Sequence, residues 1–136
     1  MAEVVGLVAS VAALAELTLK VFTNLYRYYV DLSLAPESSA TLRHELGLTL
    51  GIVESLNETV KNDTPSLHSY HRSLEGAVAE LIKMLEEMER RVGAEQTRGI
   101  RKLKWPFTKQ ENEQYLATIE RYKGTINTAM NTEQLW

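Results

Sequence analysis

Residues 66–93 read SLHSYHRSLEGAVAELIKMLEEMERRVG, and this stretch decides the fold class. Apolar side chains recur in it at every third or fourth position: Leu67, Tyr70, Leu74, Val78, Leu81, Leu85, Met88 and Val92. That spacing puts all of them on one face of a helix, with charged residues on the other faces. A helix with one apolar face needs helical partners, so the segment predicts the seam of a bundle. Gly93 is the expected C-terminal stop.

A second helical pattern precedes this segment. Pro36 is a favourable first residue for a helix, and Ser38 and Ser39 are alternative caps. Apolar residues then mark one face at helical spacing: Leu42, Leu46, Leu50, Val53, Leu56 and Val60. Residues 61–64 close this helix. Thr64 followed by Pro65 predicts an N-cap and first position for the next helix.

A further helix follows a connection over residues 94–107. Thr108 and Glu111 have the spacing of a capping box, in which each side chain binds the other residue's backbone N–H. The apolar face of this helix is formed by Tyr115, Ile119, Tyr122, Ile126 and Met130. Residues 131–134, Asn-Thr-Glu-Gln, predict a new cap and first turn, so we expect the chain to be excised from a longer protein.

The first helix is expected over residues 3–32. Its second half carries a charged stripe, whereas after Glu3 its first half has only glycine, serine and alanine between apolar residues. A helix that is apolar or small nearly all round is either buried among neighbours or destined for lipid. Both interpretations stay open, because a helix at a chain terminus can be buried in one state and released in another.

Together these patterns predict an all-α fold, an antiparallel bundle of four or five helices with a long N-terminal helix, in one domain over residues 1–136. Hydrophobic residues make up 44% of the chain and charged residues 24%, which is typical of a globular domain. The absence of cysteine excludes disulfides, a thiol nucleophile and a cysteine-ligated zinc site. Glu3 argues against a signal peptide, and Glu16 and Lys20 interrupt a transmembrane span.

No pattern in the chain predicts an enzyme, a cofactor site or a metal site. His68, His71 and Glu75 share a helix face at a spacing that could hold a metal. His44 lies about 24 Å from them in an antiparallel hairpin, so a pair of solvated histidines is the preferred interpretation. The glycines form no nucleotide-binding loop, and no serine stands in a nucleophile elbow.

Positive charge gathers in one stretch, at Arg90, Arg91, Arg98, Arg101, Lys102, Lys104 and Lys109, against Glu95 alone. Trp105 and Phe107 lie inside it. A polybasic segment with aromatics suits an anionic lipid surface, with Arg98, Arg101, Lys102, Lys104 and Lys109 as lipid contacts. The alternative is a solvated loop whose Trp105 and Phe107 plug the end of the bundle. Nucleic acid is not expected, because no nucleic-acid-reading motif accompanies the charge.

Two segments carry a resemblance to a known family. The N-terminal Gly6-Leu7-Val8-Ala9-Ser10-Val11 and the later Arg101-Lys102-Leu103-Lys104-Trp105-Pro106-Phe107 before a capped helix resemble the fungal HeLo-like domain. This domain stands ahead of NACHT or other STAND modules in fungal NLR-like receptors. The resemblance spans nearly the whole chain, and the Leu-Lys-Trp-Pro-Phe stretch is its most specific part.

The resemblance implies an effector of programmed cell death in fungal innate immunity and heterokaryon incompatibility. It implies a cytoplasmic domain that oligomerises, relocates to the plasma membrane and permeabilises it through its N-terminal helix. The expected partners are anionic lipids, other copies of the chain and a downstream NACHT/STAND module. By position, the inserting residues are Val4, Val5, Leu7, Val8, Val11 and Leu14. The alternative function is a soluble helical adaptor that binds a partner protein.

Overall fold

The computed structural model describes residues 2–25, 28–29, 36–62, 70–96, 103–104 and 107–134, and its side chains within residues 6–25, 40–62, 70–92 and 107–130. Four helices and two short strands follow one another: α1 (Ala2–Leu25), β1 (Tyr28–Tyr29), α2 (Pro36–Lys61), α3 (His71–Gln96), β2 (Leu103–Lys104) and α4 (Lys109–Gln134). The predicted all-α four-helix bundle is confirmed.

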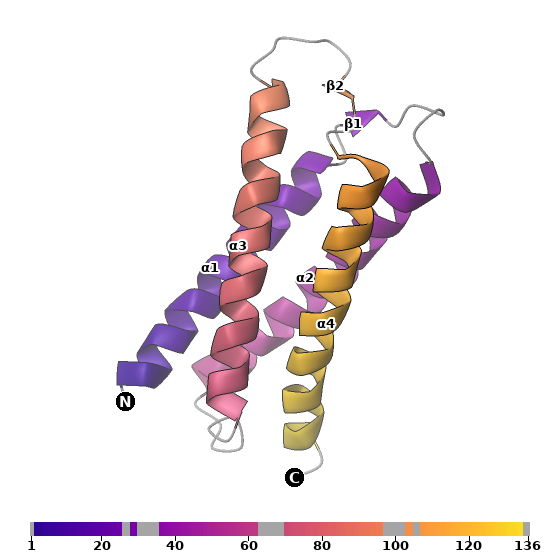
Figure 1. The fold of residues 1–136 in the computed structure, drawn as a ribbon. Helices are drawn as coiled ribbons and strands as arrows, with labels where there is room; N and C mark the ends of the chain where they lie inside the picture. The colour runs from indigo at the N-terminus through magenta and orange to yellow at the C-terminus, as the bar shows by residue number, and fades with distance from the viewer. Residues whose placement is uncertain are drawn as a thin grey trace.

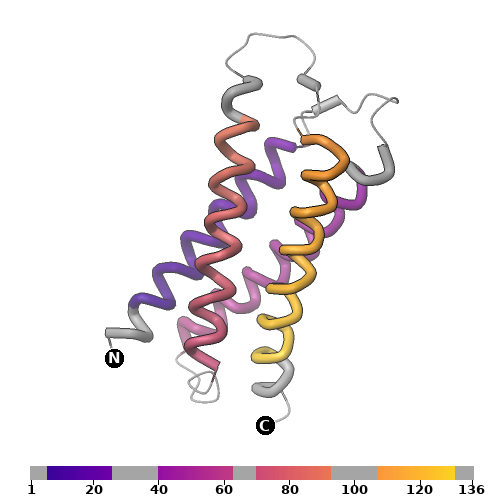
Figure 2. Tube along the Cα trace, in the orientation of Figure 1, coloured from indigo at the N-terminus to yellow at the C-terminus, as the bar shows by residue number. Residues whose placement is uncertain are grey.

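Successive helices run in opposite directions (Figure 1). α1 packs against α2 and α3, and α4 packs against the same two helices. The four helices therefore form a ring in the order α1, α2, α4, α3, in which α2 and α3 lie diagonally although they follow each other in the chain. The coloured trace in Figure 2 shows the N-terminal part of α1 and the C-terminal part of α4 at the same end of the bundle.

One apolar core runs through the middle of the ring. Each helix contributes residues at three- and four-residue spacing. The sequence predicted this for Leu42, Leu46, Val53 and Leu56 of α2, for Leu74, Val78, Leu81, Leu85, Met88 and Val92 of α3, and for Tyr115, Ile119 and Ile126 of α4. From α1 the core takes Leu7, Val11 and Leu14 among others. Leu50 is only half-buried, and Thr49 takes the buried place beside it. Thr49 is accommodated because its hydroxyl donates to the Glu45 carbonyl.

The first helix is shorter than predicted. It ends at Leu25, and Tyr28 and Tyr29 form a strand that pairs in parallel with Leu103 and Lys104. The helical pattern does continue past residue 25 in the sequence. The prediction of helix at Tyr28 and Tyr29 is wrong because a distant segment supplies these residues with backbone partners, which local periodicity does not report. Residues 30–32 lie outside the described part.

Some helix boundaries are confirmed and others are wrong. α2 begins at Pro36, so Ser38 and Ser39 lie inside the helix and are not its caps. α3 continues past Gly93 to Gln96, because glycine lowers helix propensity by only about 1 kcal/mol and good helix formers follow it. α4 continues through residues 131–134, where a new cap had been predicted. Thr64, Pro65 and Leu67 lie outside the described residues.

The predicted capping box at the start of α4 is present. The Thr108 backbone N–H donates to Glu111 Oε1 at 2.9 Å, and the Glu111 N–H donates to Thr108 Oγ1 at 3.1 Å. Two backbone donors at the helix start are thereby satisfied. The capping box fixes where α4 leaves the basic connection.

Candidate functional site: the first helix and its anchors

α1 is buried along one face only. Its buried side chains are Leu7, Val11, Leu14, Thr18, Val21 and Leu25. Its exposed residues are Gly6, Ala9, Ala13, Glu16, Leu19, Lys20 and Thr23. The first half of the outer face is thus small and uncharged, and Leu19 is 49% exposed. α1 is not the central helix of the bundle, so burial alone does not account for a composition that is apolar or small nearly all round.

The residues expected to enter a membrane are held inside the bundle in this state. Leu7, Val11 and Leu14 lie in the core, and Val8 is half-buried against it. The side chains of Val4 and Val5 lie outside the described part. Contact of these residues with lipid would therefore require α1 to leave α2 and α3.

Glu16 and Lys20 were expected to interrupt a transmembrane span, but the stretch Gly6–Leu25 of α1 that contains them is long and apolar enough to cross a membrane, judged by its 20 residues and composition. It is the one such stretch in the described residues. Length and composition alone decide little, since the core helix of a soluble protein passes the same test. In this bundle, however, only 28% of that stretch is buried.

Polar contacts hold α1 near its C-terminal end. Arg43 Nη2 of α2 donates to the Leu25 carbonyl at 2.9 Å, which places a cation at the negative end of the helix dipole. Lys20 Nζ lies 2.5 Å from Glu89 Oε1 of α3. Phe22 packs over Gly47 so closely that an added Cβ at Gly47 would lie 3.2 Å from the ring. These contacts join the last two turns of α1 to both of its neighbours.

The two halves of α1 are held differently. Among the described residues, no side chain of α1 before Thr18 has a polar contact with another helix, and Thr18 itself donates within the helix to the Leu14 carbonyl. The first half is held by apolar contacts of Leu7, Val11 and Leu14. For residues 6–17, separation from the bundle would break no ion pair or interhelical hydrogen bond made by their own side chains.

Phe107, one of the two aromatic residues of the basic connection, is buried at the end of the bundle. Phe107 is 3% exposed and meets the Tyr115 ring edge-on, with 5.1 Å between ring centroids. Arg91 lies over the Phe107 ring at 5.3 Å and forms an ion pair with Glu111. This is the packing expected of a plug at the end of the bundle, and in this state it leaves Phe107 no access to lipid.

Of the other predicted lipid contacts, Lys109 is exposed at the first residue of α4. Lys104 lies in β2, where its backbone pairs with Tyr29, but its side chain is not described. Arg98, Arg101, Lys102 and Trp105 lie outside the described residues. The role of these residues stays a prediction.

The β1–β2 pair sets where the basic connection lies. It joins the segment after α1 to the segment before α4, at the end of the bundle opposite the start of α1 (Figure 1). The 24 residues of α1 span about 36 Å. β2, the described strand within the basic connection, is therefore beside the C-terminal end of α1 and far from its N-terminal end, an arrangement that sequence reasoning did not predict.

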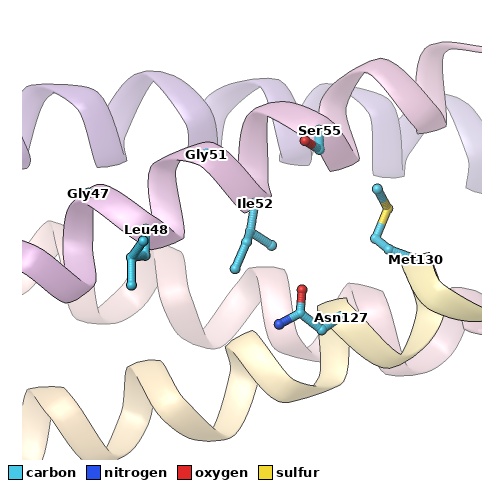
Figure 3. A pocket seen from close by; sticks show the side chains of 7 residues that line it. All are labelled: Gly47, Leu48, Gly51, Ile52, Ser55, Asn127 and Met130. Atoms are coloured by element: carbon cyan, nitrogen blue, oxygen red, sulfur yellow. The ribbon is translucent and has the colours of Figure 1, made fainter.

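A shallow groove of about 330 Å³ lies between α2 and α4. Its lining residues are Gly47, Leu48, Gly51, Ile52, Ser55, Asn127 and Met130, none of them charged. Figure 3 shows Leu48 and Ile52 reaching from α2 towards α4, with Asn127 and Met130 on the opposite wall. Sequence reasoning missed the groove, although small residues at positions 47, 51 and 55 were a signal for it.

An ion pair links α2 to α4. Lys123 Nζ lies 2.7 Å from Glu45 Oε2 and 2.9 Å from Glu120 Oε1. The hydrogen bond from Lys123 lowers the pKa of the Glu45 carboxyl, and the hydrogen bond to Glu45 raises the pKa of Lys123. Burial raises the pKa of Tyr115, whose hydroxyl neighbours Arg91. These shifts belong to contacts between helices, and none suggests a general acid or base.

The histidine cluster gives no metal site in the described residues, where no three potential ligands come together. His71 Nε2 lies 3.5 Å from Glu75 Oε2, and His68 falls outside the described residues. Comparisons with protein-family models, with curated proteins and with solved structures find no match for this chain. The resemblance to HeLo-like domains therefore rests on the sequence segments that carry it.

Proposed function

We propose that this chain is a HeLo-like effector domain that stands ahead of a NACHT/STAND module in a fungal NLR-like receptor. On activation it oligomerises, moves from the cytoplasm to the plasma membrane and inserts α1 into an anionic bilayer. Permeabilisation of that membrane causes regulated cell death.

The observation that carries the proposal is the one-sided burial of α1. A helix of membrane-spanning length lies at the edge of the bundle, with an outer face that is small and uncharged over its first half. Transfer of this helix into lipid replaces one apolar environment for Leu7, Val11 and Leu14 by another. The exposed alanines and Gly6 add no charge that lipid would reject.

The length of α1 decides how much of it must move. Residues 6–15 span about 15 Å as a helix, which is half of the roughly 30 Å hydrocarbon core. Insertion across the bilayer thus needs the whole stretch Gly6–Leu25. Lys20 would then leave Glu89, and Glu16 stands four residues before it, the favourable order for an i,i+4 ion pair. The exchange of partners lowers the cost of taking Lys20 from the bundle.

The anchors near Leu25 make the C-terminal end of α1 the natural pivot. Leu103 and Lys104 of the basic connection lie at that same end, where they pair with β1. A bundle that rests with its basic connection on anionic lipid would have the pivot of α1 at the membrane surface. α1 then needs to swing about one end only, without crossing the width of the molecule.

The experiment that tests this proposal is dye release from vesicles with and without anionic lipid, combined with a reversible lock on α1. Because the chain has no cysteine, Lys20→Cys with Glu89→Cys can be joined by a bis-methanethiosulfonate linker and freed again by reducing agent. We expect the locked protein to leave anionic vesicles intact and the reduced protein to release their dye. Circular dichroism on each sample verifies folding.

The matched control is the same linker between Glu45→Cys and Lys123→Cys, which joins α2 to α4 and leaves α1 free. This control should release dye in both states. Equal release by the locked and reduced Lys20/Glu89 pair would refute insertion of the full helix. A folded protein that neither binds nor permeabilises vesicles, even when oligomerised by a fused domain, would favour the adaptor function.

The electrostatic part has its own test. Charge reversal at Arg101, Lys102 and Lys104 should abolish binding to anionic vesicles, since each cation contributes about 1 kcal/mol near such a surface. Vesicle sedimentation measures binding, and a thermal melt checks that the fold is retained. Unchanged binding would mean that the basic connection does not recruit the domain.

A further inference from the structure

The outer face of α2 lacks exposed charge between residues 40 and 53. Its outward residues there are Thr41, His44, Leu48 and Gly51, followed by Ser55, whereas exposed Glu54 and Glu58 lie beyond position 53. Most exposed residues of α3 between positions 72 and 90 are charged. A partner could cover α2 between residues 40 and 53 without burying an unpaired lysine, arginine or carboxylate.

A projecting side chain and an unfilled groove lie next to each other on this face. Leu48 is 46% exposed, one of two large apolar side chains that the described residues leave so exposed. The groove beside it continues along Gly51 and Ser55 towards Met130 (Figure 3). An added Cβ at Gly51 would meet nothing within 4 Å, so the groove is open above this residue.

We propose that this face binds a second copy of the chain, α2 against α2, about a two-fold axis. Each Leu48 then enters the groove of the other copy, above Gly51 and Ser55, as a knob enters a hole. A surface that carries both the knob and the hole is complementary to itself. The proposed function supplies the expectation that the chain self-associates, and this inference rests on it to that extent. The surface through which the copies bind is the new part.

Charge fixes the direction of the two helices. The far end of the face carries exposed Glu58, and the near end carries exposed Thr41 and His44. A parallel pair would bring the two Glu58 carboxylates together. An antiparallel pair centred between Leu48 and Gly51 brings each Glu58 opposite the turn that contains Thr41 and His44, so the avoided repulsion between carboxylates favours the antiparallel arrangement.

The size of the face suits a small, weak dimer interface. From Thr41 to Glu58 the helix is about 26 Å long, and with its groove it is about two helices, or roughly 20 Å, wide. The projected area is therefore about 500 Å², and the accessible area that side chains present is larger. This approaches the roughly 800 Å² that each partner contributes to a stable interface.

Sedimentation equilibrium of the full chain without lipid tests the surface. We expect a monomer–dimer equilibrium with a dissociation constant below about 1 mM. Leu48→Lys should weaken the dimer at least about tenfold, and so should Gly51→Leu, which fills the groove. Leu19→Lys and Gly76→Leu are the matched controls, because Leu19 is the other exposed leucine and Gly76 also has open space above it. A monomer at every concentration, or equal weakening by the controls, overturns the proposal.

Cysteine pairs test the direction. In an antiparallel dimer, His44→Cys mixed with Ser55→Cys should form a disulfide between the two variants, whereas His44→Cys alone should form little. Disulfides formed by each single variant with itself, and none in the mixture, would overturn the antiparallel contact. The natural chain contributes no cysteine to either reaction.

These measurements separate the surface from the membrane function. A dimer lost in Leu48→Lys supports the surface even where the natural protein leaves vesicles intact. Dye release by a protein that is monomeric at all concentrations overturns the surface and leaves the release of α1 standing.

Discussion

α1 and α3 lie side by side and run in the same direction, yet their outer faces differ (Figure 1). Both bury one apolar face in the core. α3 turns Arg72, Glu75 and Lys83 to water, whereas the first half of α1 exposes Gly6, Ala9 and Ala13. The charged outer face of α3 keeps that helix at a water interface. Between Gly6 and Ala13 α1 exposes no charged side chain, and its core contacts are the ones that oppose release of this segment.

The anchors of the two helices differ as well. Arg91 on α3 contacts Phe107 and Glu111 and thereby joins α3 to the start of α4. α1 is joined through the Leu25 carbonyl and Lys20, both towards one end. Arg91 thus ties α3 to the next helix, whereas the described α1 side chains from Gly6 to Leu17 make no polar contact with another helix.

The largest expected effect concerns the core. Leu14→Ala in α1 and Leu81→Ala in α3 each remove a fully buried leucine and should lower the free energy of unfolding by about 2–5 kcal/mol. The comparison predicts that Leu14→Ala also speeds dye release, because it weakens the contacts that retain α1. Urea unfolding and vesicle leakage measure the two effects. Slower leakage for Leu14→Ala than for the natural chain would contradict the retained-helix mechanism.

The second largest difference between α1 and α3 is expected when a charge is placed on the outer face of each helix. Ala13→Glu and Ala79→Glu are both exposed, so each should change the unfolding free energy by less than about 0.5 kcal/mol. In a bilayer a charged residue near the helix centre costs about 3 kcal/mol, so Ala13→Glu should reduce dye release about 100-fold. Ala79→Glu should leave release unchanged. Full release by Ala13→Glu would show that α1 does not enter lipid.

The anchors come third. Arg43→Met removes the charged donor to the Leu25 carbonyl and should cost about 1.5–3 kcal/mol. Arg91→Met breaks a more exposed ion pair and should cost about 0.5–1 kcal/mol. Only Arg43→Met should accelerate dye release. Thermal unfolding with parallel leakage assays measures both, and acceleration by Arg91→Met would show that release depends on overall stability.

The Glu45–Lys123 pair joins α2 to α4 and makes the stability of the bundle depend on pH. The lowered pKa of Glu45 gives stability above the unfolded pKa of about 4.3, and this stability is lost as the pH falls through the lower folded value. Glu45→Gln should cost about 1–2 kcal/mol at pH 7 and flatten the acid side of the stability curve. Denaturant unfolding between pH 2 and pH 7 measures the unfolding free energy at each pH. If its slope against pH is the same in Glu45→Gln and in the natural chain, the prediction is wrong.

The smallest effect concerns the start of α4. Thr108→Ala removes the cap on the Glu111 N–H and should cost about 1 kcal/mol. Thr108→Ser is the control and should restore most of it. Neither Thr108 variant should change dye release in the leakage assay, because the cap does not contact α1. A loss equally large in Thr108→Ser would mean that the hydroxyl is not the cap.

The sequence predicted local features well. The period of residues 66–93 identified the buried face of α3 from Leu74 to Val92, and the Thr108–Glu111 spacing identified a capping box whose two hydrogen bonds are present. Gly93 and residues 131–134 misled, because a stop signal is a weak preference that good helix formers beside it can outweigh. Such signals act within a few residues, and the energies involved are small.

The candidate site was predicted less completely than the fold. Leu7, Val11 and Leu14 were identified as one apolar set, but not as the core face of a helix whose other side is exposed. The anchor of Arg43 on the Leu25 carbonyl involves residues 18 positions apart, and the β1–β2 pair joins segments more than 70 positions apart. Neither contact leaves a local signal, because each depends on how the helices pack.

By itself, the sequence determined that four amphipathic segments would form helices and bury their apolar faces together, since helical period and capping are properties of neighbouring residues. Only the tertiary structure decided the order of the ring, which puts α1 at an edge between α2 and α3 and opens a groove between α2 and α4. Helices with similar apolar faces can pack in more than one order. Side-chain fit between distant segments, such as Phe22 over Gly47, helps to select one of them.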